Sequence, residues 1–546
     1  MRTVILVWLV AVVACFVPIW LQTMRLPDCK PPETLRLPPA SVLDRAAPRF
    51  RVVVVSPDSD LAWNTTHALS QLLMGDSSTD MFSDATFGAA TAPRETIRGV
   101  LHSADVEAAL RKASLAPEET PGLFDIVVVC ATDADAEPGM DVGRGRGAWV
   151  VAADFAPDSA ADIAAAVRAV ARPVARCWAS VRARVLGTGA AHMRPAREYV
   201  LAFTLLFEDG GADSAGRARG WDFAAAEARY LAPLRAALEP AALTRVRSDV
   251  LRYARLNADL GTATRDGRRV RTLARRAAPF ALQPRAEDWH VDRSVPAPLP
   301  DTTPRTVLSC VVIVPSPDHS PLYFQDDDSG NNDSPRRRGH GDDLHDSIFV
   351  DDFGMLYVLN DANATEGEGD IKTEALTGVF RAFVAHLRAA LGLSSAYVAA
   401  EDAVRVHYRG AGGVLRWEAD AVAAGAVAHA VGRAARLHRA LRAERADKRY
   451  IALPPATCAD LAEAQRALDR VRAPDAAGAQ DAWRALALVA HATGRPDITV
   501  VSDVPDEHLY ALYLPLFGPI LVQLFTLVRV RVAHVLRKRK EAHAES

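Results

Sequence analysis

Two apolar stretches near the ends of the chain constrain its fold more than any other feature. Residues 4–21 contain no charged side chain, and a helix of that length rises about 27 Å. Residues 509–528 form a second such stretch, in which only Gln523 and Thr526 are strongly polar. Each stretch is long enough to cross the hydrocarbon core of a bilayer as a helix. The sequence therefore predicts one transmembrane helix at each end of the chain.

The first stretch also has features of a cleaved signal peptide. Arg2 opens the chain, and Cys15 follows small residues as in a lipoprotein cleavage site. The residues after Cys15 stay apolar as far as Leu21, however, where a mature lipoprotein turns polar. We therefore expect a retained transmembrane helix over residues 4–21.

Charge predicts the orientation of the two helices. Because basic flanks favour the cytoplasmic side of a membrane, residues 529–546 are predicted to form a basic cytoplasmic tail. With two spans, residues 1–3 are cytoplasmic as well, and residues 22–508 lie on the lumenal side. The basic residues on which this orientation rests are Arg529, Arg531, Arg537, Lys538, Arg539 and Lys540.

The use of asparagine supports a lumenal position for the middle of the chain. Only six asparagines occur, and three of them, Asn64, Asn332 and Asn363, open an N-x-S/T sequon. Asn332 is the weakest acceptor, because Pro335 follows its sequon. We predict N-glycosylation at these three positions. The alternative is that they are chance sequons in a cytosolic protein.

Overall composition excludes several classes of protein. A hydrophobic content of 49% is too high for a disordered chain. The 64 basic and 67 acidic residues give a net charge of -3, so no global field favours a nucleic acid as partner. Cys15 lies in the first predicted span and Cys29 just beyond it. The remaining cysteines, which can pair in three ways, are Cys130, Cys177, Cys310 and Cys458.

Apolar strands alternate with helices over the first two thirds of the chain. Strands are predicted over residues 49–56, 124–130, 149–155, 199–207 and 306–315. Helices are predicted over residues 63–74, 159–172 and 222–238. The alternation predicts a lumenal α/β domain over residues 22–372, with a mixed or mostly parallel sheet covered on both faces.

The character of the sequence changes near residue 373. Ala-rich segments over residues 373–391, 417–446 and 459–492 predict helices with little strand between them. We therefore expect a lumenal helical part over residues 373–508. Residues 325–347 (QDDDSGNNDSPRRRGHGDDLHDS) are too polar to pack and predict a solvated loop.

Two patterns suggest binding sites but have simpler interpretations. Residues 143–147 (GRGRG) are rich in glycine, but an apparent strand follows them where a phosphate-binding loop opens a helix, so they predict a turn. His340 and His345 lie among aspartates in the polar loop, where no rigid element fixes a metal site. We expect no cofactor and no metal.

Cys130 ends an apolar strand, as the nucleophile of some α/β cysteine proteases does. His67 and His102 lie upstream, but no glycine-rich oxyanion loop follows Cys130. We therefore expect no catalytic residue in this chain. The alternative is a membrane-anchored lumenal glycosyltransferase or hydrolase, for which residues 133–135 (DAD) supply a D-x-D motif.

Specific residues add a resemblance to this architecture. Ser320, Pro321, Leu322 and Tyr323, followed by Gln325 and Asp326, are similar to the S-P-L-Y-x-Q-D segment of the phosphatidylinositol glycan class S family, the S subunit of the glycosylphosphatidylinositol (GPI) transamidase. Near the end of the chain, Tyr513 with Pro515, Leu516 and Phe517 resembles the family's Y-x-P-L-F segment. Weaker matches are Trp221 with Asp222, and Trp417 with Glu418.

This resemblance implies a noncatalytic subunit of a membrane complex in the endoplasmic reticulum. Such a complex cleaves a C-terminal signal from a precursor protein and attaches a GPI anchor in its place. The resemblance implies that the nucleophilic cysteine belongs to a caspase-like partner subunit, and that the motif residues of this chain are structural. The expected partners are the other transamidase subunits and the membrane, with the precursor protein or the GPI lipid as further candidates.

Overall fold

The computed structural model describes most of the chain between residues 29 and 540. The described ranges are 29–43, 48–74, 80–103, 105–116, 123–130, 139–143, 145–152, 159–185, 195–208, 220–239, 241–281, 305–326, 344–350, 353–360, 370–393, 404–406, 413–447, 453–473, 475–495, 522–523 and 525–540. The chain divides into two compact units. The first comprises Met1–Leu37, Gly432–Asp469 and Arg484–Ser546, and the second comprises Pro38–Val431 and Arg470–Trp483.

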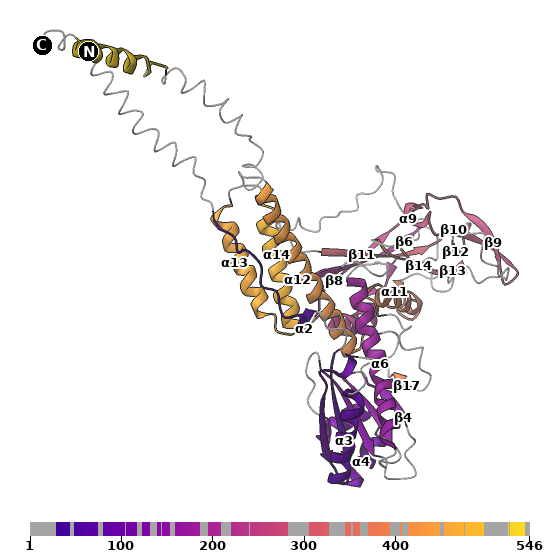
Figure 1. The fold of residues 1–546 in the computed structure, drawn as a ribbon. Helices are drawn as coiled ribbons and strands as arrows, with labels where there is room; N and C mark the ends of the chain where they lie inside the picture. The colour runs from indigo at the N-terminus through magenta and orange to yellow at the C-terminus, as the bar shows by residue number, and fades with distance from the viewer. Residues whose placement is uncertain are drawn as a thin grey trace, which may run out of the picture. The chain divides into compact units, whose positions relative to one another are not determined.

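The second unit begins with a mostly parallel sheet of six strands (Figure 1). Its strand order is β17-β4-β5-β3-β1-β2. The pairing of β4 with β5 is antiparallel, and the other four pairings are parallel. Runs of valine in β1 and β3 suit strands that are buried on both faces. The strands are β1 (Arg49–Ser56), β2 (Thr86–Thr91), β3 (Leu123–Cys130), β4 (Gly139–Val142), β5 (Gly147–Ala152) and β17 (Val404–Val406).

Helices cover both faces of this first sheet. On one face, α3 (Ser59–Met74) and α6 (Ala160–Val185) bury Leu69 and Val167 against the valines of β1 and β3. On the other face, α4 (Arg94–Leu101) and α5 (Val106–Lys112) pack Ile97 and Leu110 against the alternate residues of the same strands. The two sets of residues alternate because successive side chains of a strand point to opposite faces.

A second sheet of five strands has the order β14-β15-β11-β6-β8. Strands β8, β6, β11 and β15 are parallel, and β14 is antiparallel to β15. One face is covered by α11 (Thr377–Ala390) and by the helical segment formed by α7 (Phe223–Ala226), η3 (Glu227–Leu231) and α8 (Ala232–Leu238). The strands are β6 (Glu198–Phe207), β8 (Leu243–Leu251), β11 (Arg305–Val314), β14 (Ser347–Val350) and β15 (Gly354–Val358).

The opposite face of the second sheet packs against a smaller sheet. This third sheet has the order β13-β12-β10-β9, and its Leu273, Leu322 and Phe324 form one core with Val311 and Ile313 of β11. A two-stranded pairing joins β7 (Gly220–Trp221) with β16 (Asp370–Ile371). The strands of the third sheet are β9 (Gly261–Arg265), β10 (Arg268–Ala274), β12 (Leu322–Gln325) and β13 (Leu344–His345). Short helices are α2 (Ala40–Leu43), η1 (Asp80–Phe82) and α9 (Ala278–Ala281).

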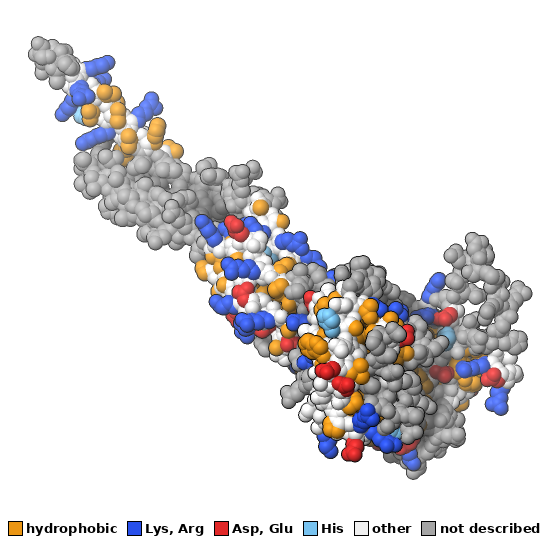
Figure 2. All heavy atoms as spheres, turned by 60° about the horizontal axis from the view of Figure 1, so that its bottom comes forward, with side chains coloured by type: hydrophobic (Ala, Val, Ile, Leu, Met, Phe, Trp, Pro, Cys, Tyr) orange, Lys and Arg blue, Asp and Glu red, His pale blue; other side chains and the backbone are white. Residues whose placement is uncertain are grey.

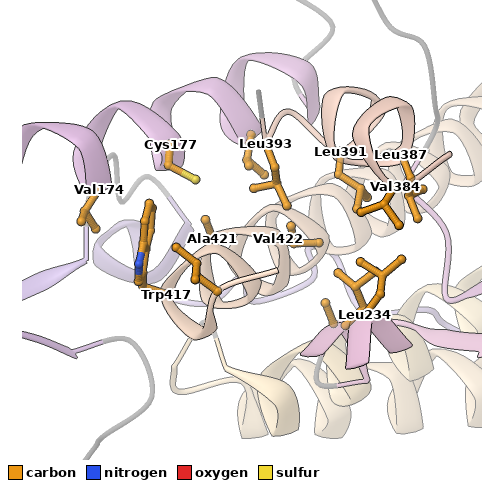
Figure 3. Close-up of a cluster of buried hydrophobic side chains, with 14 of the residues drawn as sticks. Val174, Cys177, Leu234, Val384, Leu387, Leu391, Leu393, Trp417, Ala421 and Val422 are labelled. Atoms are coloured by element: carbon orange, nitrogen blue, oxygen red, sulfur yellow. The ribbon is translucent and has the colours of Figure 1, made fainter. Parts of the chain in front are cut away.

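The two large sheets share one hydrophobic core, which the start of α12 (Arg416–Asp447) enters. Trp417 is 1% exposed, and its ring meets that of Phe124 of β3 edge to face, with centroids 6.5 Å apart. Figure 3 shows Trp417 on the side of α12 that faces Val174 and Cys177 of α6. The first turn of α12 is therefore part of the α/β core.

A buried ion pair lies beside Trp417. Glu418 is fully buried, and its two carboxylate oxygens accept hydrogen bonds of 2.6 and 2.7 Å from the guanidinium of Arg388 at the end of α11. The same carboxylate accepts a hydrogen bond from the Leu415 N–H, and Arg388 also donates to the Gly413 carbonyl oxygen. Each charge is thus neutralised and hydrogen-bonded, which burial of a charged group requires.

We predict that Glu418→Ala lowers the free energy of unfolding by about 3–5 kcal/mol, because the guanidinium of Arg388 then stays buried without its counter-charge. Denaturant unfolding of the purified chain in mild detergent measures this loss. Asp326→Ala is the matched control. It breaks the ion pair between Asp326 and Arg275, both of whose side chains are about half exposed, and should cost about 1 kcal/mol or less. Equal losses in the two variants contradict the prediction.

The first unit is helical. It contains α13 (Pro455–Arg470) except for its last residue, the C-terminal half of α12 and the end of α14 (Ala476–Thr493). Side-chain contacts join α13 to α14: Arg484 pairs with Glu463, and Nδ1 of His491 lies 2.9 Å from a carboxylate oxygen of Asp460. Residues 525–540 form a further helix at the end of the described chain (Figure 1).

Comparison with the sequence predictions shows where apolar patterns suffice. The strands predicted over residues 49–56, 124–130, 199–207 and 306–315 are confirmed to within one residue at each end. The predicted α/β class is confirmed, with the strands of the described residues distributed over four sheets rather than one. The Ala-rich segment predicted to be helical over residues 459–492 forms two helices, α13 and α14. The loop expected over residues 325–347 ends in strand, since β13 and the start of β14 occupy residues 344–347.

Most residues of the two predicted membrane helices are not among the described residues. Residues 4–21 and all but the end of residues 509–528 lie outside the described residues. Among the helices that the structure describes, none has both the length and the apolar content that crossing a bilayer requires. The two spans and the division of the lumenal chain at residue 373 stay predictions.

Candidate functional site

The segment Ser320 to Asp326, on which the family resemblance rests, joins the second sheet to the third. It follows β11, the central strand of the second sheet, and continues as β12. The carboxyl ends of parallel strands β6 and β11 meet at this edge, which is where α/β sheets commonly bind ligands. We therefore take this edge as the candidate site.

A buried carboxylate organises the chain at this edge. Glu208 directly follows β6, and its side chain is 5% exposed. One of its oxygens accepts a hydrogen bond of 2.8 Å from the Ser316 N–H, and the other lies 2.6 Å from Nδ1 of His319. The His319 side chain is about one-third exposed. A carboxylate that orients a histidine is one half of an acid–base pair, but here it also fixes the turn after β11.

The motif residues themselves pair strands and fill the core. Leu322 is fully buried, and its backbone N–H and carbonyl oxygen bond to the side-chain amide of Asn360 at 2.8 and 2.7 Å. The Arg271 N–H donates to the Pro321 carbonyl oxygen, and the Arg275 N–H donates to that of Gln325. The peptide bond between Ser320 and Pro321 is cis. These contacts hold β12 between Asn360 and β10.

Two motif side chains meet arginines on the outer side of the third sheet. The guanidinium of Arg265 lies over the ring of Tyr323, 4.4 Å from its centroid. Asp326 pairs with Arg275 at 3.1 Å and with His345 at 3.3 Å. Partial burial alone raises the pKa of Asp326, but the hydrogen bonds and charges of Arg275 and His345 outweigh it, so that pKa lies below its usual value.

A Ser–His hydrogen bond lies beside this segment. Oγ of Ser347 is 3.2 Å from Nε2 of His386, whose ring also packs against that of Phe349. Burial, and then the charge of Arg275, lower the pKa of His386 below its usual value of 6.5. The pair has a nucleophile and a neutral base, but no carboxylate hydrogen-bonds to His386 among the residues that the structure describes. This geometry lacks the group that orients the base in a hydrolytic triad.

We predict that stability falls as the pH drops below about 6.5, because the unfolded chain then takes up a proton that the folded His386 resists. His386→Gln, which can keep a hydrogen bond to Ser347, should reduce this dependence. Arg275→Gln should reduce it in the same direction, since it removes a repelling charge. Thermal unfolding midpoints between about pH 7.5 and pH 5.5 measure the effect. A dependence that is unchanged in both variants contradicts the assignment.

The glycine-rich residues 143–147 form the predicted turn. They connect the antiparallel strands β4 and β5, and the Gly143 N–H donates to the Gly147 carbonyl oxygen at 2.8 Å. The carboxylate of Glu107 accepts from the Gly145 N–H, so an acidic side chain lies where a phosphate-binding loop holds its ligand. The guanidinium of Arg146 forms a bidentate ion pair with the carboxylate of Asp420 on α12, with distances of 2.5 and 2.8 Å.

The residues weighed for cysteine chemistry do not form a described site. Cys130 ends β3 opposite Ala152 of β5. His67 is exposed and contacts Gln71 one turn along α3, and His102 is exposed and contacts the Arg98 carbonyl oxygen of α4. Residues 133–135 and His340 lie outside the described residues. In the part of the chain that the structure describes, no three His, Cys, Asp or Glu side chains gather as metal ligands.

A small apolar hollow lies between α6, β6, α11 and α12. Val181, Tyr199, Leu391 and Val422 are among its lining residues, and its volume is about 30 Å³. That is room for about one water molecule, well below the volume of a drug-sized ligand site. Burial raises the pKa of Tyr199 to about 12, against the smaller opposing effect of the hydrogen bond with the backbone of Ala196. The hollow is therefore a packing defect rather than a ligand pocket.

Residues 29–37 form an extended segment that we call the N-terminal strap. It lies in the first unit, and a disulfide joins its Cys29 to Cys458 of α13. This corrects the sequence analysis, which left Cys29 out of the pairing. Cys177 and Cys310 are free and buried, and burial raises the pKa of the Cys310 thiol. A disulfide is what an oxidising compartment such as a lumen allows.

Hydrogen bonds continue this attachment along the strap. The Cys29 N–H donates to the Leu453 carbonyl oxygen at 3.0 Å. Further along, the backbone of Arg36 pairs with the side-chain amide of Gln465 at 2.8 and 3.2 Å. The strap is also bonded by Arg442 and Arg445 of α12, which donate to the carbonyl oxygens of Glu33 and Cys29. The start of the described chain is thus fixed to helices that follow it by more than 400 residues.

We predict that Cys29→Ser lowers the free energy of unfolding by about 2–4 kcal/mol, because the strap is then held by hydrogen bonds alone. Thiol alkylation under denaturing, non-reducing conditions should find one more reactive cysteine than in the unchanged chain. Cys458→Ser is the matched variant and should give the same two results. Different losses in the two variants, or a fully reduced pair in protein taken from intact microsomes, contradict the assignment.

The sequons have one described member. Asn64 lies on α3 and is exposed, whereas Thr66, the third residue of its sequon, is buried and donates to the Ala62 carbonyl oxygen. Asn332 and Asn363 lie outside the described residues, as do Pro515, Leu516 and Phe517. The exposure of Asn64 leaves room for a glycan. Glycosylation at the three sites stays a prediction.

A comparison with family models decides the relationship of this chain to known proteins. The model of the phosphatidylinositol-glycan biosynthesis class S protein matches residues 8–436, well over half of the chain. The chain belongs to this family. The resemblance inferred from the Ser320 to Asp326 segment is thereby confirmed. No curated protein matched the chain.

Membership of the class S family gives the chain a role in GPI-anchor biosynthesis, in connection with the GPI transamidase. The matched region contains the strap, both large sheets and the start of α12 with Trp417 and Glu418. Cys458 and α13 follow the end of that region. The sequence predicted neither Glu208 nor Arg388 as an important residue, because each depends on a partner more than 25 residues away.

Proposed function

We propose that the chain is a noncatalytic subunit of the GPI transamidase of the endoplasmic reticulum, needed for attaching GPI anchors to precursor proteins. The observation that carries this proposal is the match of the class S family over residues 8–436. The contacts of the motif residues support it: Leu322 fills a core, Tyr323 stacks under Arg265 and Asp326 forms an ion pair. These are structural contacts within the chain, as expected of motif residues in a noncatalytic subunit.

The proposed arrangement in the membrane has two spans, with both termini in the cytoplasm and the α/β part in the lumen. The basic residues after residue 528 support this orientation. The disulfide between Cys29 and Cys458 supports a lumenal position for both of its ends. The exposed sequon at Asn64 supports the same side for α3. The proposed partners are the other transamidase subunits, including the caspase-like catalytic subunit.

The test is genetic complementation of cells that lack this subunit. We predict that Cys130→Ala restores GPI-anchored proteins at the cell surface to about the level of the unchanged chain, because the nucleophile belongs to another subunit. The tagged chain should also copurify with the catalytic subunit in mild detergent. Surface display, by flow cytometry, and subunit abundance are measured together.

Glu418→Ala is the control for this experiment, since it should lower surface display through lower abundance of the subunit. A strong loss of display by Cys130→Ala, at normal abundance and with normal copurification, would falsify the noncatalytic assignment. A chain that never copurifies with the catalytic subunit contradicts its place in the complex.

A further inference from the structure

The last described helix, residues 525–540, has two distinct kinds of surface. It contains six lysines and arginines and no acidic residue. Its large apolar side chains are nevertheless exposed, with Phe525 at 73%, Val532 at 51% and Leu536 at 54%. Figure 2 shows both the basic and the hydrophobic side chains along this segment. In a tail surrounded by water, exposure of such apolar side chains is unfavourable.

Five of the large apolar residues share one side of the helix. At 100° per residue, a set spaced by three, four, three and one positions falls in an arc of about 100°. We call this set the apolar stripe, and it consists of Phe525, Val528, Val532, Val535 and Leu536. Five of the six basic residues lie outside the arc. The sixth, Arg539, lies within it, about one turn beyond Leu536. Val530 is equally exposed, at 57%, but points away from the stripe.

The stripe continues beyond the predicted membrane span, which ends at Val528. A helix that left the membrane along its normal would carry Val532 and Leu536 about 6 and 12 Å into water. A helix that lies in the headgroup region buries them instead, and its basic residues then meet lipid phosphates. A basic amphipathic helix with a narrow apolar side is typical of membrane-surface segments.

From this we infer that residues 529–540 bind the surface of an anionic membrane, with Val532, Val535 and Leu536 of the apolar stripe at the boundary between headgroups and acyl chains. Charge complementarity selects the occupant, since six cations without an acid match a negatively charged leaflet. The inference rests on the proposed anchoring of the chain in a membrane. It adds a second contact with lipid, outside the span, whose strength depends on lipid charge.

Hydrogen exchange of the full chain in nanodiscs tests this inference. One set of nanodiscs contains phosphatidylcholine alone, and in the other about a third of the lipid is phosphatidylserine. Each basic residue at an anionic surface should shift the equilibrium about fivefold. Amide exchange over residues 529–540 should therefore be at least about tenfold slower in the anionic nanodiscs, and raised salt should reverse much of the difference.

Two valines provide a matched pair of variants. Val532→Asp puts a charge in the apolar stripe and should abolish the protection by anionic lipid, whereas Val530→Asp puts the same charge outside the stripe and should leave most of it. Equal exchange in the two lipid compositions overturns the inference, and so do equal effects of the two variants. Protection that arises only when other subunits are added also overturns it, in favour of a protein partner. None of these outcomes alters the complementation experiment, so failure here is distinct from failure of the proposed function.

Discussion

The buried charge of Glu418 is the constraint on which the second unit depends. An ionised carboxylate in an apolar core is stable only with a counter-charge and hydrogen bonds, and Arg388 with the Leu415 N–H supplies both. Arg388 ends α11, which covers the second sheet, and Glu418 lies in the first turn of α12, beside the contact of Trp417 with Phe124 of the first sheet. The ion pair therefore fixes which ends of these helices can meet. Asp420, two residues after Glu418, forms a second ion pair with Arg146, and the two pairs together fix the rotation of α12 about its axis.

Sequence patterns predicted the parts of the fold that depend on local repetition. Runs of valine and other apolar residues located β1, β3, β6 and β11, because strands buried on both faces are apolar almost throughout. The patterns failed for β9 and β10, which contain arginines and threonines with few apolar residues and whose burial comes from a neighbouring sheet. The break between α13 and α14 was missed as well, although Pro474 between the two helices is a recognisable breaker in the sequence.

The candidate site shows the same limit. Its segment was identified by resemblance, but its physical organisation depends on Glu208 and Asn360, which lie 108 and 38 residues from their partners. Nothing in the local sequence of either residue predicts such a contact. The GRGRG turn was predictable because a strand followed it, whereas its link to α12 through Arg146 was not. The side chains that organise this site connect helices and strands that are distant in the sequence, so their contacts can be identified only once the fold is known.

The disulfide of the strap has a consequence for synthesis of the chain. Cys29 and Cys458 are 429 residues apart. At about 5–20 residues per second, a ribosome needs roughly 20 to 90 seconds to make the intervening chain. During that time Cys29 has no Cys458 with which to pair, while Cys130, Cys177 and Cys310 emerge first. Cys177 and Cys310 are buried in the folded structure, which keeps these two thiols from competing for Cys29. The strap therefore cannot close before α13 has been made, so this disulfide marks a chain that has been synthesised past all the strands of both large sheets.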